Sequence, residues 1–138
     1  MHDAVITPES PAGRSATPQS GAPTRVLVVD DSAVIRERLS GILNELEGIT
    51  IVGEAEDGRE AVTMVEDLHP DVVILDIRMS GGSGLEALEQ IKRLEPAPVI
   101  AILTNYPYSQ YRDRCAALGA DFFFDKSTEF GRIAEAFQ

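Results

Sequence analysis

Cysteine is nearly absent from this sequence, and none of its apolar stretches is long. With Cys115 as the one cysteine, an intrachain disulfide and a zinc site built from several cysteines are excluded. No apolar run approaches the about 20 residues that a helix needs to cross a bilayer. The opening residues, MHDAVITPESPAG, lack the basic segment followed by an apolar segment that marks a secretory signal. We therefore expect a cytoplasmic protein.

Positive charge is also scarce. The chain carries 12 Lys and Arg against 23 Asp and Glu, for a net charge of −11. Binding of nucleic acid needs concentrated Lys and Arg opposite the phosphates, and binding of an anionic membrane needs clustered basic residues. The charge balance therefore argues against direct nucleic-acid contact and against membrane binding.

The composition changes near residue 24. Residues 1–23 are rich in Pro, Ser and Ala and hold few side chains that could bury apolar area, so we expect a disordered tail. The remaining residues, 24–138, suit one domain with one core. The predicted organisation is therefore a tail over 1–23 and a single domain over 24–138.

Within that domain, short Val- and Ile-rich runs alternate with helical patterns. The runs read as strands buried on both faces. The predicted strands are Arg25–Val29, Thr50–Ala55, Val72–Leu75, Val99–Leu103 and Asp121–Phe124. The predicted helices run from Ser32 to about Leu46 (with Ile35, Leu39, Ile42 and Leu46 on one stripe), over Gly58–Leu68, over a segment carrying Leu85, Leu88, Ile91 and Leu94, over Tyr108–Leu118, and from Ser127 or Thr128 to near Phe137. This alternation predicts an α/β fold with a parallel sheet covered on both faces.

A polar residue follows four of these strands. Asp30 and Asp31 follow the first strand, Asp76 follows the third, Thr104 follows the fourth and Lys126 follows the fifth. Because ligands of open parallel sheets bind at the carboxyl ends of the strands, we expect these side chains to meet at one edge. Clustered carboxylates repel one another unless a cation neutralises them, and a small set of oxygen ligands favours Mg²⁺.

Each of these residues also has a simpler explanation. Asp31 or Ser32 could cap a helix, Asp76 could begin a turn, and Lys126 could be solvated. In the functional interpretation, Asp76 attacks phosphorus to form an acyl phosphate. Thr104 and Lys126 would then hold phosphoryl oxygens. The glycine-rich loop after Asp76 would let the backbone bend beside the site.

Four segments together resemble the receiver domain of two-component response regulators: VLVVDDSAVIRERL, VVILDIRMSGGSGLEAL, VIAILTNY and GADFFFDKS. The resemblance covers about Arg25 to Phe137. It implies a flavodoxin-like (βα)5 doubly wound parallel sheet with strand order 2-1-3-4-5. It also implies Asp76 as phosphoacceptor, with Thr104 and Lys126 in the reaction. The implied Mg²⁺ ligands are Asp30, Asp31, Asp76 and the backbone carbonyl of Arg78, and the implied switch residues are Thr104 and Phe123.

Two positions depart from the family pattern. Ser80 stands where the family often has proline, and Ser127 stands where the family often has a proline in cis linkage. A cis bond before a residue other than proline is costly, so a trans bond is expected at Lys126–Ser127. Neither change removes a reactive group.

The resemblance implies a stand-alone receiver that takes a phosphoryl group from a sensor histidine kinase or a phosphotransfer protein. Output would pass through an unidentified protein partner, at a face expected over residues 106–123, or through a phosphorelay. We expect it not to be a turnover enzyme. Two alternatives stay open: a small-molecule phosphatase, which would need an acid where Arg78 stands, and a flavodoxin-like cofactor binder, whose phosphate Asp30 and Asp31 would repel.

Overall fold

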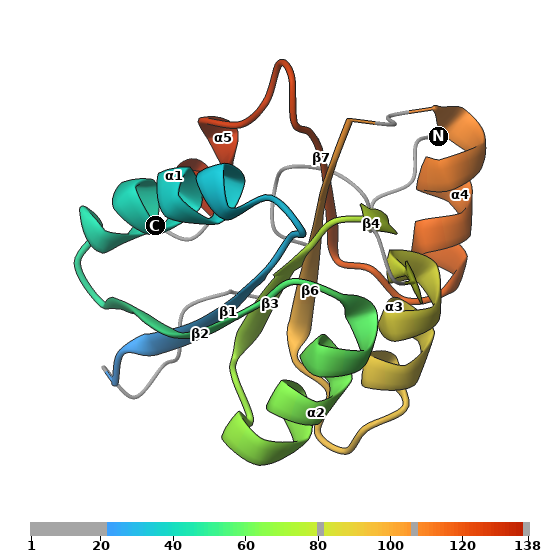
Figure 1. The fold of residues 1–138 in the computed structure, drawn as a ribbon, viewed down its shortest axis with the longest axis horizontal. Coiled ribbons are helices and arrows are strands. Elements are labelled where there is room, and N and C mark those ends of the chain that lie inside the picture. Colours follow the sequence, from blue (N-terminus) through green and yellow to red (C-terminus); the bar gives the residue numbers. More distant parts are fainter. Residues whose placement is uncertain (1–21, 80–81, 106–107, 137–138) are drawn as a thin grey trace.

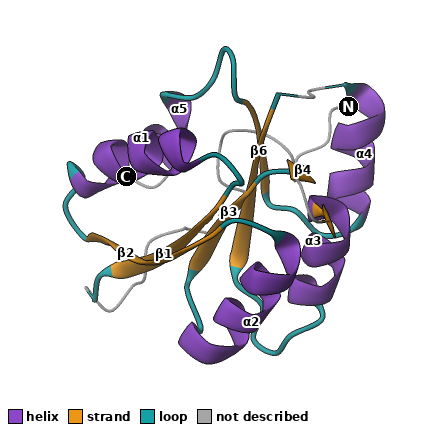
Figure 2. Ribbon diagram, in the orientation of Figure 1, coloured by secondary structure: helices purple, strands orange, loops and turns teal. Residues whose placement is uncertain are grey.

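The computed structural model describes residues 22–79, 82–105 and 108–136, with the side chains of Gly82 and Ser83 outside this description. Strands and helices alternate along the chain, as the sequence pattern predicts (Figures 1 and 2). The elements are β1 (Thr24–Val29), α1 (Ala33–Asn44), β2 (Ile49–Ala55), α2 (Gly58–Leu68), β3 (Val72–Leu75), β4 (Arg78–Met79), β5 (Gly82–Ser83), α3 (Gly84–Lys92), β6 (Val99–Thr104), α4 (Ser109–Ala117), β7 (Phe122–Asp125) and α5 (Arg132–Ala136).

Five of the strands form one parallel sheet, in the order β2-β1-β3-β6-β7. Counted along the sheet strands alone, this is the order 2-1-3-4-5, and it confirms the predicted doubly wound, flavodoxin-like fold. The sequence order reverses beside β1 and β3, which is where a doubly wound sheet opens a crevice for ligands.

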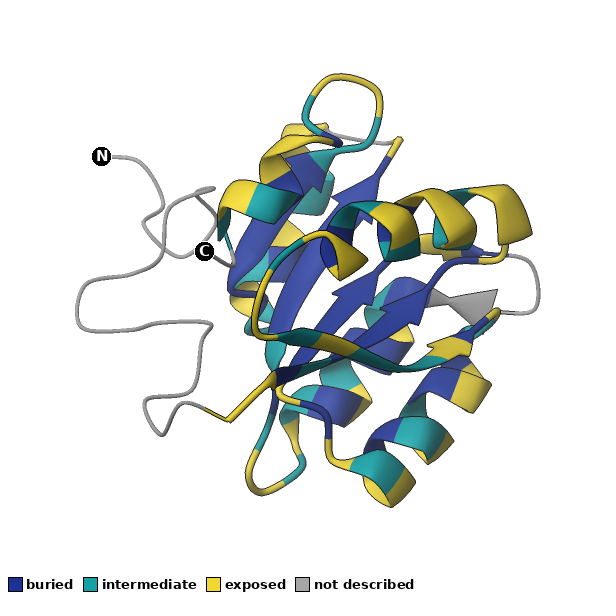
Figure 3. Ribbon diagram, turned by 90° about the vertical axis from the view of Figure 1, so that its left-hand side faces the viewer, coloured by how far each residue is buried: buried dark blue, intermediate teal, exposed yellow. Residues whose placement is uncertain are grey.

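Helices cover both faces of the sheet (Figures 1 and 3). One apolar cluster packs α1 and α5 against Val26, Val28 and Ile74. The other packs α2, α3 and α4 against the opposite side chains of the same strands. Because both faces are buried, the four residues of β3 are all apolar and all buried. None of the described helices is long and apolar enough to span a membrane.

Three details differ from the sequence prediction. The last helix begins at Arg132 rather than at Ser127 or Thr128. The Asp125 carboxylate accepts hydrogen bonds from the backbone N–H (2.9 Å) and the hydroxyl (2.7 Å) of Ser127, which folds this segment into a turn instead. In α1 the predicted stripe is confirmed, since Leu39 is buried and Ile35, Ile42 and Leu46 pack against the same core cluster, but the fully buried Leu43 was not predicted.

The third difference lies after Asp76. The segment predicted as a plain loop contains a short antiparallel pair, in which β4 pairs with β5. Ser80 and Gly81 lie outside the described residues, as do residues 1–21, which hold nearly all of the predicted tail. The domain limits of 24 and 138 therefore stay a prediction, although β1 does begin at Thr24.

Candidate functional site

Asp30 and Asp76 lie side by side because their strands are neighbours in register. Val29 of β1 pairs with Leu75 of β3, and each strand is followed at once by its aspartate. The backbone N–H of Asp76 donates to the Val29 carbonyl at 3.1 Å, which continues the ladder up to the site. The strand ends therefore fix the separation of the two carboxylates, as expected for a parallel sheet.

Asp31 completes a cluster of three carboxylates. One oxygen from each of Asp30, Asp31 and Asp76 lies within 4.8 Å of the others. Asp30 and Asp76 are buried, at 2% and 6% exposure, whereas Asp31 is open to solvent. Two buried oxygens beside one exposed oxygen fit a hard cation that keeps some of its waters, which is the behaviour of Mg²⁺. The donor set thus agrees with the magnesium site that the sequence predicts.

Lys126 reaches this cluster from the end of β7, the edge strand that lies two strands away from β3. Its ammonium nitrogen Nζ lies 2.7 Å from Asp30 Oδ2 and 3.0 Å from Asp76 Oδ2, and its side chain is only 7% exposed. The backbone N–H of Lys126 donates to the Thr104 carbonyl at 2.7 Å, which anchors the lysine to the end of β6. One buried cation therefore bridges two buried anions.

The protonation of this group follows from burial and charge. Burial raises the pKa of Asp76 above its usual range, and the charge of Asp30 adds to this effect, while Lys126 opposes it. Burial alone would lower the pKa of Lys126, but the hydrogen bond to Asp30 and the charges of both aspartates outweigh it and leave the pKa raised. Lys126 is thus held as a cation, and ionised Asp76 is the least favourable charge in the site.

Residues around Asp30 hold it in place. Its Oδ1 accepts the backbone N–H of Ser32 at 2.9 Å. Its backbone carbonyl accepts a hydrogen bond from Arg36 at 2.7 Å, and Arg36 also pairs with Glu54 on β2 at 2.9 Å. Ser32 caps α1 by accepting the Ile35 N–H, as predicted. The sequence analysis missed Arg36, because an arginine in the first turns of a surface helix carries no distinguishing signal.

Gly84 is a further residue whose role the sequence only suggests. At this position a Cβ would clash with the backbone oxygen of Asp76 and lie 2.7 Å from the Cα of Ile77. The Gly84 N–H donates to the Ile77 carbonyl at 2.6 Å. The first turn of α3 therefore packs against the main chain of Asp76 in a space that only glycine fits. The sequence signal was the glycine-rich run after Asp76.

The two candidate switch residues are both buried. Thr104 ends β6 with no exposed surface, and Phe123 of β7 is 1% exposed. Phe123 pairs in register with Ile102, two residues before Thr104. The guanidinium carbon of Arg112 on α4 lies 4.6 Å from the centre of the Phe123 ring, within the range of a cation–π contact. Phe123 thus occupies the inward position in this structure.

The remaining expectations divide between described and undescribed residues. Arg78 is exposed, and its backbone N–H donates to Asp76 Oδ1 at 3.3 Å. On the expected partner face, Tyr106 and Pro107 lie outside the described residues, and Tyr108 is 57% exposed beside Tyr111. Among the described peptide bonds the one in cis is Glu95–Pro96, so the Lys126–Ser127 bond is trans, as expected.

Comparisons with known proteins show the family of this chain. The model of the response regulator receiver domain matches residues 26–138. The chain is 40% identical over 104 residues to the transcriptional regulatory protein YdfI of Bacillus subtilis (strain 168), covering 75% of this chain and 48% of that protein. The structure of the CheX–CheY–BeF3–Mg²⁺ complex from Borrelia burgdorferi is similar with a TM-score of 0.74 and 29% identity, covering 86% of this chain and 92% of that chain.

A third relative corrects one expectation. The chain is 41% identical over 104 residues to a protein-glutamate methylesterase/protein-glutamine glutaminase of Alkalilimnicola ehrlichii, covering 74% of this chain but 26% of that protein. The relatives of this sequence therefore include enzymes. We expected from the receiver motifs that this protein is not a turnover enzyme, and that expectation is wrong, because the motifs do not support it. The matched part spans about half or a quarter of these relatives, and the same motifs occur in proteins named as regulators and as enzymes.

Proposed function

This chain belongs to the response regulator receiver domain family, and on that basis we propose that Asp76 accepts a phosphoryl group from a sensor histidine kinase or a phosphotransfer protein. The observation that carries the proposal is the contact of one buried lysine with two buried aspartates, Asp30 and Asp76, beside a third carboxylate. Such a cluster is costly without a ligand and suits a dianionic phosphoryl group with a divalent cation.

In the proposed reaction a carboxylate oxygen of Asp76 attacks phosphorus, and a phosphorus–oxygen bond forms. The bond from phosphorus to the donor's imidazole nitrogen breaks, its electron pair returns to the imidazole, and the imidazole takes a proton from solvent. Burial favours this role, because ionised Asp76 is poorly solvated and loses its negative charge at the reacting oxygen when the acyl phosphate forms.

Asp30, Asp31, Asp76 and the Arg78 carbonyl would hold Mg²⁺, which when bound offsets the charge on the phosphoryl oxygens. Lys126 would exchange its contact with Asp76 Oδ2 for a phosphoryl oxygen while keeping its contact with Asp30. Thr104 would turn its hydroxyl toward another phosphoryl oxygen. These roles extend the charge pattern of the site to the phosphorylated state.

For output, we propose that the signal passes from Thr104 to Phe123 and the face of residues 106–123. The Thr104 hydroxyl would leave space that the Phe123 ring can enter, and the two packings would differ by a few kcal/mol. Exposed Tyr108 supports a protein partner at this face. A phosphorelay to a second phosphotransfer protein would use the Asp76 phosphoryl group directly.

The experiment is incubation with Mg²⁺ and acetyl phosphate, followed by intact-mass measurement. The wild type should gain one phosphoryl mass that alkali removes. Asp76→Asn should gain none, and the matched control Asp67→Asn, an exposed position on α2, should label like the wild type. Chelation of the metal should stop labelling. Undiminished labelling of Asp76→Asn would overturn the assignment.

A further inference from the structure

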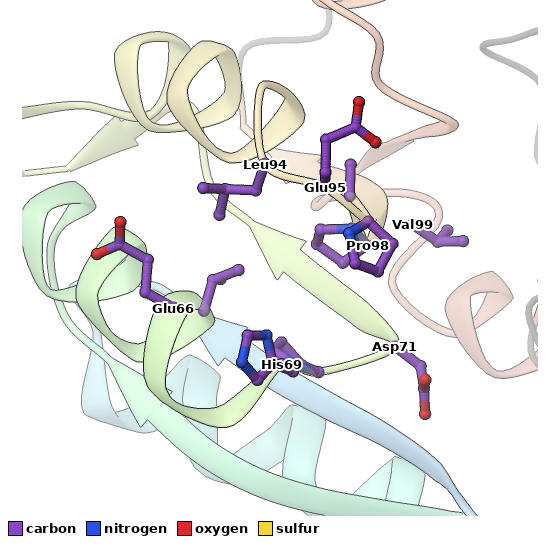
Figure 4. Close-up of a pocket in the computed structure, with 11 residues that line it drawn as sticks. Glu66, His69, Asp71, Leu94, Glu95, Pro98 and Val99 are labelled. Atoms are coloured by element: carbon purple, nitrogen blue, oxygen red, sulfur yellow. The ribbon is translucent and has the colours of Figure 1, made fainter.

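A cavity of about 470 Å³ lies at the edge of the sheet opposite the aspartates (Figure 4). It is framed by the end of α2, by the connection from α2 to β3, and by the connection from α3 to β6. These connections lead into Val72 and Val99, the first residues of β3 and β6, whereas Asp76 and Thr104 lie at the other ends of the same strands. The cavity is therefore separate from the phosphorylation site, and its volume falls in the range of small-molecule sites.

Most residues of the cavity walls are apolar, and hydrogen bonds from residues outside the cavity hold the walls in place. Val65, Pro70 and Pro98 are buried wall residues. Arg25 donates to the carbonyls of Leu68 and His69, at 2.7 and 2.9 Å, and so fixes the connection after α2.

The facing wall is fixed in the same way. Lys92 donates to the Pro98 carbonyl at 2.8 Å while pairing with buried Asp121. The two connections are also joined to each other, because the Val99 N–H donates to the Asp71 carbonyl at 2.9 Å. The cavity is thus a preformed site, which a ligand can enter without first ordering its walls.

The rim is acidic and offers acceptors rather than donors. Glu66 projects from α2, Glu95 belongs to the facing connection, and Asp71 lies at the start of β3 (Figure 4). No lysine or arginine lines the cavity, and none of these three carboxylates forms an ion pair within the described residues. The prolines of the wall have no N–H to donate. Arg25 and Lys92 bind wall carbonyls from outside the cavity, and the Asp71 carboxylate accepts the Arg25 backbone N–H at 2.8 Å. A cation at the mouth would therefore meet the carboxylates of Glu66 and Glu95.

We propose that this cavity binds a small aromatic amine, with the ring against the proline wall and the ammonium group at the acidic rim. The proline rings of the wall and the imidazole of His69, on the connection after α2, offer surfaces for an aromatic body. Glu66 and Glu95 stand on different walls, so an ammonium group at the mouth can approach the carboxylate of either wall. The proposal for this cavity does not rest on the phosphorylation proposed for Asp76.

Tryptamine is a suitable probe, and indole-3-propionate is its matched anion. Titration into the full chain, followed by two-dimensional amide NMR, should shift the amides of Val65, His69 and Val99 with a millimolar Kd for tryptamine. Indole-3-propionate should bind at least about tenfold more weakly, because it meets the same ring surface but the opposite charge. Equal binding of the two probes, or no saturable shift at these amides, would overturn the proposal.

Variants connect the binding to the cavity. Glu66→Gln with Glu95→Gln should weaken tryptamine by about three- to tenfold, since exposed charges are partly screened. Asp67→Asn, the neighbouring exposed carboxylate on α2 that does not line the cavity, should leave the Kd unchanged. Ala97→Phe should fill the space and abolish binding. If Ala97→Phe does not fold, the glutamine pair decides, because an unchanged Kd in that folded variant would refute the role of the rim.

Discussion

Asp76→Asn should make the protein more stable in the absence of divalent cations at neutral pH. Ionised Asp76 is buried, and its carboxylate lies within 4.8 Å of Asp30 and 3.0 Å from Lys126. With an effective dielectric constant of about 20, the repulsion is about 3.5 kcal/mol and the attraction about 5.5 kcal/mol. The attraction exceeds the Asp30 repulsion by about 2 kcal/mol. The screened repulsion from solvent-exposed Asp31 offsets part of this difference, and we expect the loss of hydration to outweigh the remainder. Asparagine keeps the shape and removes that cost, for a gain on the order of 1 kcal/mol.

The pH dependence of folding stability provides a second test of whether ionised Asp76 destabilises the protein. Because burial raises the folded-state pKa of Asp76 above the ordinary 3.8, protonation favours the folded state. The wild type therefore holds this contribution below pH 3.8 and loses it as the pH rises through the folded-state pKa. The advantage of Asp76→Asn should thus be largest above the folded-state pKa of Asp76 and shrink as the pH falls through it.

Urea unfolding at pH 7 and at pH 5, with and without Mg²⁺, measures both effects. Mg²⁺ should stabilise the wild type and remove the advantage of Asp76→Asn, which has lost a ligand. Asp31→Asn should give a smaller gain because Asp31 is exposed, and Asp67→Asn should change stability by less than about 0.5 kcal/mol. A less stable Asp76→Asn at pH 7 without Mg²⁺ would refute the reasoning.

Three further outcomes are expected. Gly84→Ala should destabilise the fold by about 1–3 kcal/mol in urea, because its Cβ meets the Asp76 carbonyl, whereas Gly41→Ala, with open space around it, should not destabilise. Thr104→Ala should accept phosphate from acetyl phosphate but lose most of the coupling to the output surface, read from Phe123 side-chain NMR; an unchanged phosphorylation-induced shift would contradict this. Arg78 and Tyr106 follow Asp76 and Thr104 by two positions, so from the sequence we expect a long cation and a bulky ring to border the approach of water. Arg78→Asn combined with Tyr106→Glu should therefore speed loss of the phosphoryl group, and slower decay of the double variant would exclude shielding.

The sequence predicted the site through strand ends. Each apolar run stops at a polar residue, and a parallel sheet brings those ends to one edge, so Asp30 and Asp76 could be expected to meet before any coordinates. Ser32 as a cap followed from its position before an amphipathic run. The strand order followed from the resemblance to receiver domains, because alternation alone leaves several right-handed topologies.

What the sequence did not predict depends on side chains and close backbone contacts. The hydrogen bond of Arg36 to the Asp30 carbonyl and the packing of Gly84 on Asp76 need tertiary distances. The late start of α5 results from the Asp125 side chain, which binds Ser127 in a turn and outcompetes a helix that local propensity favours. The mistaken expectation about enzyme activity has another cause. A receiver motif gives no information about the activities of the longer proteins that contain it.

The fit between Gly84 and the Asp76 main chain has a mechanical consequence. Helix α3 begins in contact with the Asp76 carbonyl and, about 14 Å further on, ends at Lys92, whose ammonium group holds the Pro98 carbonyl in the wall of the cavity. Between these ends, Leu88 and Ile91 are fully buried in the core, and α3 is one uninterrupted helix over Gly84–Lys92. A shift of the backbone at Asp76 would therefore reach the opposite edge of the sheet along a single element, with no loop in between to absorb it.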